Sequence, residues 1–305
     1  MMMRAASRSL LILAPIDRGR PAAVFVLALL FIRCAGPEPH ATLHDDVGRS
    51  VTVAAHPRRI VSLAPNLTEI VYALGCGDRI VGVDDNSDEP AAARTKPRVG
   101  GMQPSIERIA SLKPDLVIAS TQGNQPSLAP ALAAANIPLY VVRTDRLTEI
   151  APAMARLATA LGCGDRRVPE KLRADLAAFA NRKRAHAPRV LFAVWMNPLY
   201  VAGRNNFADD LINLCGARNA VGPNVTGWPL YSLETLVAEP PDLIIYPDRE
   251  VTPAQVEELL RRVPSLRGRT EIVGVDENLF TRPGPRVAQA AARLNAIVDQ
   301  WERRF

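Results

Sequence analysis

Residues 105–118 read SIERIASLKPDLVI, and residues 232–245 read SLETLVAEPPDLII. In each copy a serine precedes a short amphipathic segment, a Pro-Asp pair ends that segment, and a brief apolar run follows. Each copy therefore predicts a short helix that leads into a buried strand, the repeating unit of an α/β domain. The repetition predicts two lobes of similar design with a cleft between them, and we look for function in that cleft.

The third residue of each copy is a glutamate, Glu107 in the first and Glu234 in the second. A carboxylate near a helix N-terminus stabilises the helix dipole by about 0.3–1 kcal/mol, which would explain either residue alone. Two carboxylates at matching positions on two lobes also form a docking pair for a basic partner that contacts both lobes. The pair therefore has a structural and a functional interpretation.

The chain has 305 residues, of which 48% are hydrophobic and 22% charged, enough for two globular cores. The first lobe alternates strand-like and helix-like segments, which is typical of parallel strands joined by crossover helices. We predict strands at 60–63, 80–83, 116–119 and 137–143, and helices at 66–74, 106–112 and 127–135. Asn66 and Glu69 fit a capping box at the start of the first of these helices.

Residues 148–186 have a helical pattern almost throughout, with a break at Gly162-Cys163-Gly164. The second lobe begins with a strand at 190–195 and continues with helices at 209–215, 253–262 and 285–303 and a strand at 272–275. We therefore predict a signal peptide at 1–40, an N-terminal lobe at 41–165, a linking backbone helix at 166–188 and a C-terminal lobe at 189–305. A single helical link resists bending, so we expect the cleft to open only slightly.

The first 40 residues have the profile of a signal peptide. Four arginines precede an apolar run at 22–32, which is about half the length that a membrane-spanning helix needs. The alternative is a retained anchor, lengthened by the apolar residues 10–14. Cys34 follows the apolar run, but Phe31, Ile32 and Arg33 before it are unlike the small residues that precede a lipidated cysteine. We expect an exported periplasmic protein without a lipid anchor.

The basic character of the chain comes partly from this leader. Residues 1–40 contain five Arg, one Asp and one Glu, so they carry +3 of the formal net charge of +6. No Lys/Arg run with interleaved aromatic residues is present, so the sequence gives no indication of nucleic-acid binding.

Three cysteines follow the leader, Cys76, Cys163 and Cys215. In an oxidising compartment they allow one disulfide and one thiol. Cys76 and Cys163 lie in a second echo, ALGCGDR at 73–79 and at 160–166, and both belong to the first lobe. They are the candidate pair. No CxxC motif is present, so neither a redox motif nor a zinc knuckle is indicated.

Catalytic machinery is missing from the sequence. There is no GxSxG elbow, and the four histidines, His40, His44, His56 and His186, lie outside the predicted cleft loops. We propose no catalytic residue, no resident metal and no cofactor. The alternative from another class is a periplasmic metal-dependent hydrolase with Asp84, Asp85 and Asp88 as oxygen ligands. The same stretch also reads as an acidic turn.

Aromatic residues form only 5% of the chain, yet several fall in loops that follow strands of the second lobe. These are Trp195, Tyr200, Trp228, Tyr231 and Phe280. Aromatic side chains at one sheet edge suit a flat or apolar ligand, although Trp195 and Tyr231 fit core positions equally well. Arg282 and Arg286 flank Pro-Gly-Pro before the last helix, where a guanidinium could meet an amide, carboxylate or phosphate or simply lie on the surface.

Several stretches together resemble the helical-backbone substrate-binding proteins of ABC importers for cobalamin, ferric siderophores and haem. They are RIVSLAPNLTE at 59–69, VGV at 81–83, the first repeat at 105–118 and the segment 228–245. The resemblance extends from about residue 58 to the C-terminus. It implies an α/β fold of two similar lobes with mainly parallel sheets, joined by one long backbone helix, with the ligand cleft between the lobes. It also implies an inner-membrane ABC permease that pairs with Glu107 and Glu234.

Within that family the chain is most similar to the cobalamin-binding branch, through NPLY at 197–200, GARN at 216–219, GWP at 227–229 and FTR at 280–282. This similarity implies ligand contacts from Asn86, Met102, Tyr200, Trp228 and Arg282. Three residues depart from the branch: Asn86 replaces an aromatic, Asn278 an acid, and Asn295 a cysteine that would pair with Cys215.

The expected function is therefore a monomeric periplasmic receptor that binds a corrinoid such as cobalamin, with any metal carried by the ligand. One alternative is a receptor for a ferric siderophore, contacted by Arg204, Arg282 and Arg286, or for haem, with Tyr200 or Tyr231 as axial ligand. Another is a binding module for a partner protein that is never coupled to import.

Overall fold

The computed structural model describes residues 40–304, apart from 125 and 181–183. All described residues belong to one compact unit, Glu38–Phe305. The predicted signal peptide, with Cys34, lies outside the described residues except for His40. Along the described chain, no helix combines the length and the apolar character that crossing a membrane requires.

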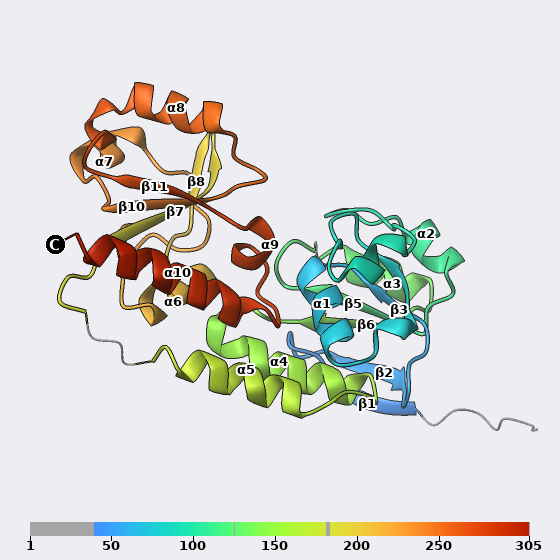
Figure 1. Cartoon of the computed structure of the whole chain (residues 1–305). Coiled ribbons are helices and arrows are strands. Elements are labelled where there is room, and N and C mark those ends of the chain that lie inside the picture. Colours follow the sequence, from blue (N-terminus) through green and yellow to red (C-terminus); the bar gives the residue numbers. More distant parts are fainter. Residues whose placement is uncertain (1–39, 125, 181–183, 305) are drawn as a thin grey trace, which may run out of the picture. The chain divides into compact units, whose positions relative to one another are not determined.

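The N-terminal lobe contains a four-stranded sheet of order β4-β3-β5-β6, in which every pairing is parallel. An antiparallel hairpin precedes it (Figure 1). The hairpin is β1 (His40–His44) and β2 (Ser50–Ala54), and the sheet strands are β3 (Ile60–Ser62), β4 (Ile80–Val83), β5 (Leu116–Ser120) and β6 (Leu139–Val142). The helices are α1 (Pro65–Ala73), α2 (Ile106–Ser111), α3 (Leu128–Ala134) and the 3-10 turns Gly77–Arg79 and Ala91–Thr95.

The C-terminal lobe has a sheet of order β11-β10-β7-β8, with β9 also paired to β7. Its pairings are parallel except for the β7–β8 hairpin. The strands are β7 (Arg189–Met196), β8 (Leu199–Val201), β9 (Arg218–Asn219), β10 (Leu243–Pro247) and β11 (Glu271–Val275). The helices are α6 (Phe207–Leu214), α7 (Leu233–Ala238), α8 (Pro253–Arg262), α9 (Glu277–Phe280), α10 (Val287–Glu302) and the 3-10 turn Pro264–Leu266.

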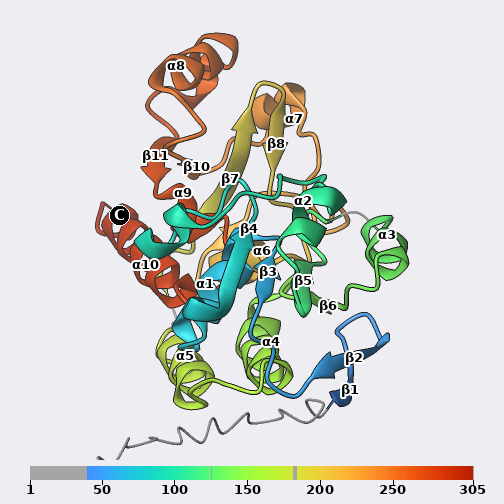
Figure 2. The same ribbon diagram turned by 90° about the vertical axis from the view of Figure 1, so that its right-hand side faces the viewer.

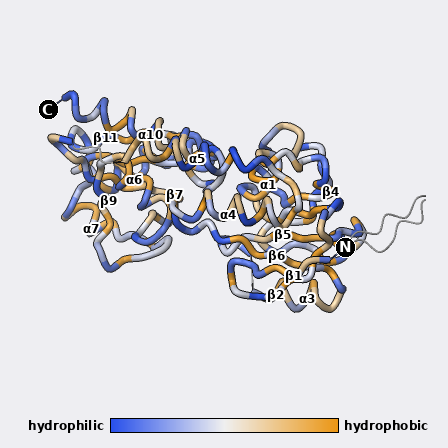
Figure 3. Tube along the Cα trace, turned by 90° about the horizontal axis from the view of Figure 1, so that it is seen from below, coloured by the Kyte–Doolittle hydropathy of each residue, from blue (hydrophilic) through white to orange (hydrophobic). Residues whose placement is uncertain are grey.

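The two repeated sequences form the predicted helix-to-strand units, α2–β5 and α7–β10. The Ser105 and Ser232 hydroxyls each accept a hydrogen bond from the backbone N–H three residues on, both at 3.2 Å. These bonds satisfy amides that a helix start leaves without partners. Strand β5 is buried over its whole length, and Figure 3 shows it in hydrophobic colours. The predicted fold class, two α/β lobes with mainly parallel sheets, is confirmed.

The connection between the lobes differs in detail from the prediction of one helix over 166–188. Helix α4 (Leu147–Ala160) is followed by α5 (Arg167–Ala177), and residues 184–188 are not helical. Pro188 disfavours the α conformation of the residue before it, which is consistent with the chain extending there into β7. Helices α4 and α5 pack against each other, and α4 contacts α6 while α5 contacts α10 (Figures 1 and 2).

The predicted capping box at Asn66 is wrong. Helix α1 begins one residue earlier, with Ala64 at the N-cap and Pro65 in the first turn, and no side chain caps it. A proline in the first turn removes no hydrogen bond, because the N–H at that position has no partner within the helix, and the φ of proline is already helical. Pro65 therefore allows the helix to begin one residue closer to the N-terminus. Asn66 and Glu69 are thereby released for other contacts.

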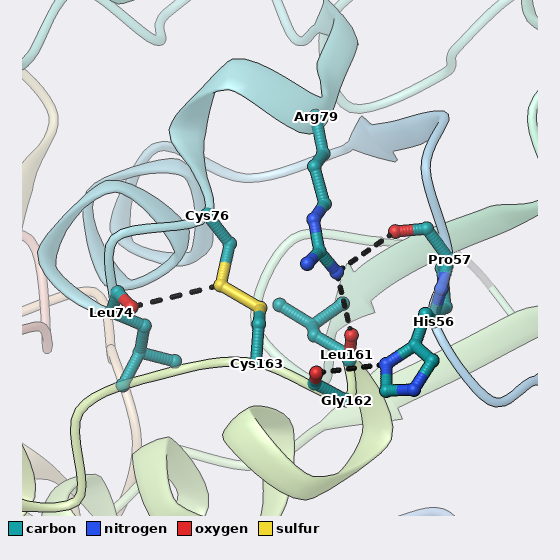
Figure 4. Close-up of a disulfide and its surroundings, with 8 residues drawn as sticks. All are labelled: His56, Pro57, Leu74, Cys76, Arg79, Leu161, Gly162 and Cys163. Carbon is teal, nitrogen blue, oxygen red and sulfur yellow. Dashed lines mark hydrogen bonds between the residues drawn. A yellow bond between two sulfur atoms is a disulfide. The ribbon is translucent and has the colours of Figure 1, made fainter.

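A disulfide joins Cys76, just after α1, to Cys163, in the turn between α4 and α5, across 87 residues of sequence (Figure 4). Around it the Arg79 guanidinium donates to the carbonyl oxygens of Pro57 at 3.2 Å and Leu161 at 2.9 Å. Gly162 has a φ of 57°, and a Cβ there would overlap the Ala55 carbonyl oxygen, so the turn requires glycine. The candidate pair from the sequence echo is confirmed.

The third cysteine, Cys215, is buried and does not take part in a disulfide. Its thiol donates to the Ala291 carbonyl oxygen at 3.4 Å. Asn295 accepts a hydrogen bond of 2.7 Å from Arg184 instead of supplying a second sulfur. The departure noted in the sequence therefore leaves the C-terminal lobe without a disulfide among its described residues.

Candidate functional site

A cavity of about 580 Å³ is lined by residues of both lobes. Its walls are the loops that follow β3, β4 and β5 in one lobe and β10 and β11 in the other. In open α/β sheets this is the edge where ligands bind. The lining residues are Ala64, Pro65, Asn66, Asn86, Asp88 and Gln122 from the N-terminal lobe, and Arg249, Glu250, Glu277, Asn278, Thr281, Arg282 and Pro283 from the C-terminal lobe.

Asp88 is the charged residue that the N-terminal lobe contributes to the cavity wall, and its ion-pair partners belong to the C-terminal lobe. Arg282 Nη1 lies 2.7 Å from Asp88 Oδ1, and Arg249 Nη1 donates to Oδ2 at 3.2 Å. The Asn278 amide donates to the same carboxylate at 3.4 Å. Burial raises the pKa of Asp88, but the hydrogen bond and charge of Arg282, with help from Arg249 and Asn278, outweigh burial and lower it to about 2.

Arg282 and Arg286 both reach a second carboxylate, that of Glu69 on α1. Arg286 binds it through two hydrogen bonds, Nε to Oε2 at 2.8 Å and Nη2 to Oε1 at 2.7 Å. Arg282 donates to Oε1 at 3.2 Å and, through Nη2, to the Asn86 carbonyl oxygen at 3.1 Å. The Glu69 side chain is only 4% exposed and that of Arg282 only 10%, so these are largely desolvated ion pairs.

The cavity also contains an acceptor that no described residue uses. Asn278 is buried, its amide nitrogen faces Asp88, and its Oδ1 has no hydrogen-bond partner. Beside it, burial raises the pKa of Glu277, and the neighbouring Glu250 raises it further. A buried polar atom without a partner is costly, so this wall favours a ligand or water that donates a hydrogen bond.

A separate aromatic surface lies at the carboxyl end of β7. Trp195 and Tyr200 are cross-strand partners in the β7–β8 hairpin, and Tyr200 forms a bridge with Leu230 on its other side. All three side chains are exposed. Because β7, β10 and β11 are parallel, this surface lies at the same sheet edge as the loops that line the cavity.

Trp228 lies in a turn that hydrogen bonds hold against the rest of the C-terminal lobe. Asn206 donates to the Gly227 carbonyl oxygen at 2.8 Å, and the Gly203 N–H donates to the same atom at 2.9 Å. The Trp228 indole packs on the buried Phe207 with ring centres 6.0 Å apart and remains partly exposed. The turn therefore presents a fixed aromatic face to solvent.

The structure unites only part of the predicted ligand set. Asn86 and Arg282 line the cavity and contact each other, whereas Met102, Tyr200 and Trp228 are not among its lining residues. Met102 is 68% exposed on a loop of the N-terminal lobe. Of the other aromatic candidates, Phe280 is fully buried against Phe192 and is a core residue.

The three acids of the hydrolase alternative do not converge. Asp84 is buried and accepts a hydrogen bond from Ser87, Asp85 is exposed, and Asp88 is paired with arginines. Burial raises the pKa of Asp84, against the lowering effect of the Ser87 hydrogen bond. No group of three His, Cys, Asp or Glu side chains within the described ranges is placed to bind a metal ion. The alternative in which these three residues form an acidic metal site is therefore wrong.

The repeated glutamates occupy equivalent places on the two lobes. Glu107 and Glu234 each lie in the first turn of their helix, α2 and α7, and both are exposed. Glu234 accepts a hydrogen bond of 2.6 Å from Ser232, which lowers the pKa of its carboxyl. Both side chains are accessible to a partner.

The sequence does not indicate that Glu69, Asp88, Arg249 and Asn278 lie at the lobe junction. Its patterns predict a capping role for Glu69 and a turn or metal-ligand role for Asp88. Their partners lie between 161 and 217 positions away in the chain, so no local pattern connects them. A chemical argument could have identified Glu69, because a glutamate within the apolar run of a buried helix requires a cation as its partner.

Comparison with known proteins shows the family to which the chain belongs. A family described as periplasmic binding protein matches residues 60–268, which is more than half of the sequence. The chain belongs to this family. A relative named vitamin B12-binding protein, from Pectobacterium atrosepticum, is 30% identical over 254 residues, covering 79% of this chain and 88% of the relative.

Two solved structures share the fold over nearly their whole length. The periplasmic heme-binding protein RhuT from Roseiflexus sp. RS-1 has a TM-score of 0.73 and 29% identity, and covers 80% of this chain and 99% of its own. The periplasmic vitamin B12-binding protein BtuF of Vibrio cholerae has a TM-score of 0.63 and 25% identity, with coverage of 81% and 98%. Relatives of this chain are thus binding proteins with different ligands.

Proposed function

We propose that this protein is the periplasmic receptor of an ABC importer, which binds its ligand in the interlobe cavity and passes it unchanged to an inner-membrane permease. Relatives named vitamin B12-binding protein and uncharacterized ABC transporter substrate-binding lipoprotein YvrC, the latter from Bacillus subtilis and 27% identical, support a role in import. A signal peptide at 1–40 would export it, as a monomer and without lipid on Cys34. No residue is assigned a catalytic role.

The proposed ligand is a corrinoid such as cobalamin, and the charge of the cavity wall carries this choice. Arg249 and Arg282 are the arginines of the wall, and both are paired with the Asp88 carboxylate. Glu250 and Glu277 add negative charge. Such a wall has little positive charge to offer an anionic ligand.

The uncharged part of the wall fits a corrinoid better. Asn86, Gln122 and Asn278 present amides, and Asn278 Oδ1 lacks a donor. The rim of a corrin ring carries primary amides, which both donate and accept hydrogen bonds. The aromatic surface with Trp195 and Tyr200, together with the exposed indole of Trp228, supplies flat apolar area for the ring. The cobalt ion would arrive within the ligand.

Haem is the second candidate, supported by the similarity to RhuT and by the exposed hydroxyphenyl group of Tyr200. A tyrosine oxygen is an accepted axial ligand of haem iron. Haem propionates, however, need available cations, and an anionic ferric siderophore would need them more. Arg204, Arg282 and Arg286 are each paired with a carboxylate of this chain.

The first test is calorimetric titration of the purified protein with cyanocobalamin, haemin and a ferric siderophore. We expect one-to-one binding of cyanocobalamin, weakened at least tenfold by Trp228→Ala because packing of the ligand on the exposed indole, worth about 2 kcal/mol, is lost. Trp301→Ala is the matched control, since it removes the same side chain at the far end of α10, about 20 Å along the helix from its start. Binding of haemin or a siderophore alone would replace the corrinoid proposal, and no binding of any of the three would favour a partner-protein module.

Docking on the permease is assigned to Glu107 and Glu234. Replacing both with arginine should abolish ligand uptake by cells while leaving ligand affinity in solution unchanged, because like charges would face each other at the permease. Glu170→Arg is the control, as Glu170 is also an exposed glutamate in the first turn of a helix. Undiminished uptake by the double variant would contradict the assignment.

A further inference from the structure

The Glu69 carboxylate is buried in one lobe, but its partners belong to the other. Each hydrogen bond that the described residues donate to it comes from Arg282 or Arg286. Both arginines lie in the segment between α9 and α10, and Glu69 lies on α1. An ionised carboxylate cannot be buried without compensation, so the burial of Glu69 depends on contact between the lobes.

A second carboxylate extends this contact along the wall of the cavity. Asp88 shares Arg282 with Glu69 and also binds the more exposed Arg249. We call the five side chains Glu69, Asp88, Arg249, Arg282 and Arg286 the interlobe clasp. Its inner end is buried and has two-point geometry at Arg286, whereas its outer end, at Arg249, is solvated.

The start of α1 also contacts the same segment through an uncharged side chain, Asn66. Asn66 donates to the Pro283 carbonyl oxygen at 3.2 Å and to the Thr144 hydroxyl at 3.1 Å. The first of these bonds crosses between the lobes, and the second orients Asn66 from within its own lobe. The clasp therefore fixes the backbone that carries Arg282 and Pro283, both of which line the cavity.

We propose that Glu69 is a positioning residue for the ligand cavity: through Arg282 and Arg286 it holds the lobes at the spacing that forms the cavity. The outer pair between Asp88 and Arg249 is weaker because water competes for it, so it separates first when the cleft opens. Opening beyond that point requires Glu69 and two guanidinium groups to separate. The clasp thereby limits how far the cleft opens and slows ligand release.

The test measures the distance between the lobes with spin labels on two exposed alanines, Ala134→Cys on α3 and Ala254→Cys on α8. Glu69→Gln removes the charge and should give a longer and broader distance distribution than the parent protein. Asp45→Asn is the matched control, because Asp45 is equally buried but accepts from Arg49 of its own lobe. The control should lose stability without a change in distance.

Ligand kinetics provide the second readout, and this part alone rests on the proposed function. Dissociation of cyanocobalamin should accelerate about tenfold in Glu69→Gln and less than twofold in Asp45→Asn, a coupling in the usual range. If cyanocobalamin does not bind the parent protein, the corrinoid proposal fails and the distances still decide on the clasp.

Arg286→Lys is a second test of the proposal, which can be used if the Glu69→Gln protein does not fold. It keeps the positive charge but loses the two-point geometry, so it should shift the distance distribution in the same direction and by less. A folded Glu69→Gln protein, or failing that Arg286→Lys, whose distance distribution and release rate match those of the parent would overturn the proposal.

Discussion

The lobes meet on two sides that are built from different interactions. On the side of α4 and α5, one cluster of buried apolar residues includes members of both lobes, such as Leu67, Leu157 and Phe207. On the cavity side the contact consists of the interlobe clasp, with charged groups of opposite sign from the two lobes. Apolar packing is lost only when the core itself is disrupted, whereas charge pairs can be exchanged for water. The first side therefore acts as a permanent joint and the second as a separable contact.

The largest effect is expected at the disulfide, which ties the turn between α4 and α5 to the end of α1. Replacing Cys76 and Cys163 with serine should lower the free energy of unfolding by about 4 kcal/mol, since the bond closes a long loop of the unfolded chain. Urea denaturation measures the loss. The distance between the spin-labelled lobes should not change, and a change would show that the two sides are not independent.

A cavity in the apolar joint should cost somewhat less. Leu157→Ala removes a fully buried side chain of α4 and should lower the free energy of unfolding by about 3 kcal/mol. Ala155→Gly on the exposed face of the same helix is the control, at about 1 kcal/mol. Equal losses for the two variants would contradict the assignment of this face to the joint.

Acid should weaken the separable side selectively. The pKa of Asp88 is lowered to about 2 in the folded protein, below its ordinary value of 3.8. The stabilisation from its ionised form is therefore complete above about pH 4 and disappears as the pH falls through 2. The distance between the lobes should increase over this range in the parent protein but not in Asp88→Asn, which lacks the titrating group. A parallel acid response in both proteins would assign the effect to other carboxyls.

The smallest effect is expected at the outer end of the clasp. Arg249→Gln removes an exposed partner of Asp88 and should change the free energy of unfolding by less than about 1 kcal/mol. Salt screens the Asp88–Arg249 pair and so favours opening of the cleft, and this part of the salt dependence of cyanocobalamin association should be lost in the variant, as measured by stopped flow at two ionic strengths. Arg261→Gln on α8, which pairs with Glu258 of the same helix, should leave this dependence intact.

The sequence predicted the elements of both lobes well, because the information for them is local. The repeated units, the helix Pro253–Arg262 and the strand Ile80–Val83 follow from apolar periodicity and from Ser, Pro and Gly at the ends. The sequence did not predict two short elements whose formation depends on packing against neighbouring segments, the three-residue strand β8 and the four-residue helix α9. The end of α5 at Ala177 was also missed, since its sequence remains helix-forming beyond that point.

The site was predictable only in part for a related reason. Asn86 was identified through resemblance to a known family and Arg282 also through its place beside Pro-Gly-Pro, and both line the cavity. The pairing of Glu69 with Arg286 joins residues 217 positions apart and arises only when the lobes come together. A buried carboxylate in one lobe indicates that a cationic partner exists. The sequence alone does not show which of the 33 arginines and four lysines of the chain is that partner.

The continuity of the buried cluster through α4 and α5 has a thermodynamic consequence. Two lobes that shared only a flexible linker would melt as two separate units, each with its own heat-capacity peak. Here neither lobe completes its apolar core without the helices that the other also uses. The protein should thus unfold in one cooperative transition, and a fragment that contains a single lobe should not retain a stable fold.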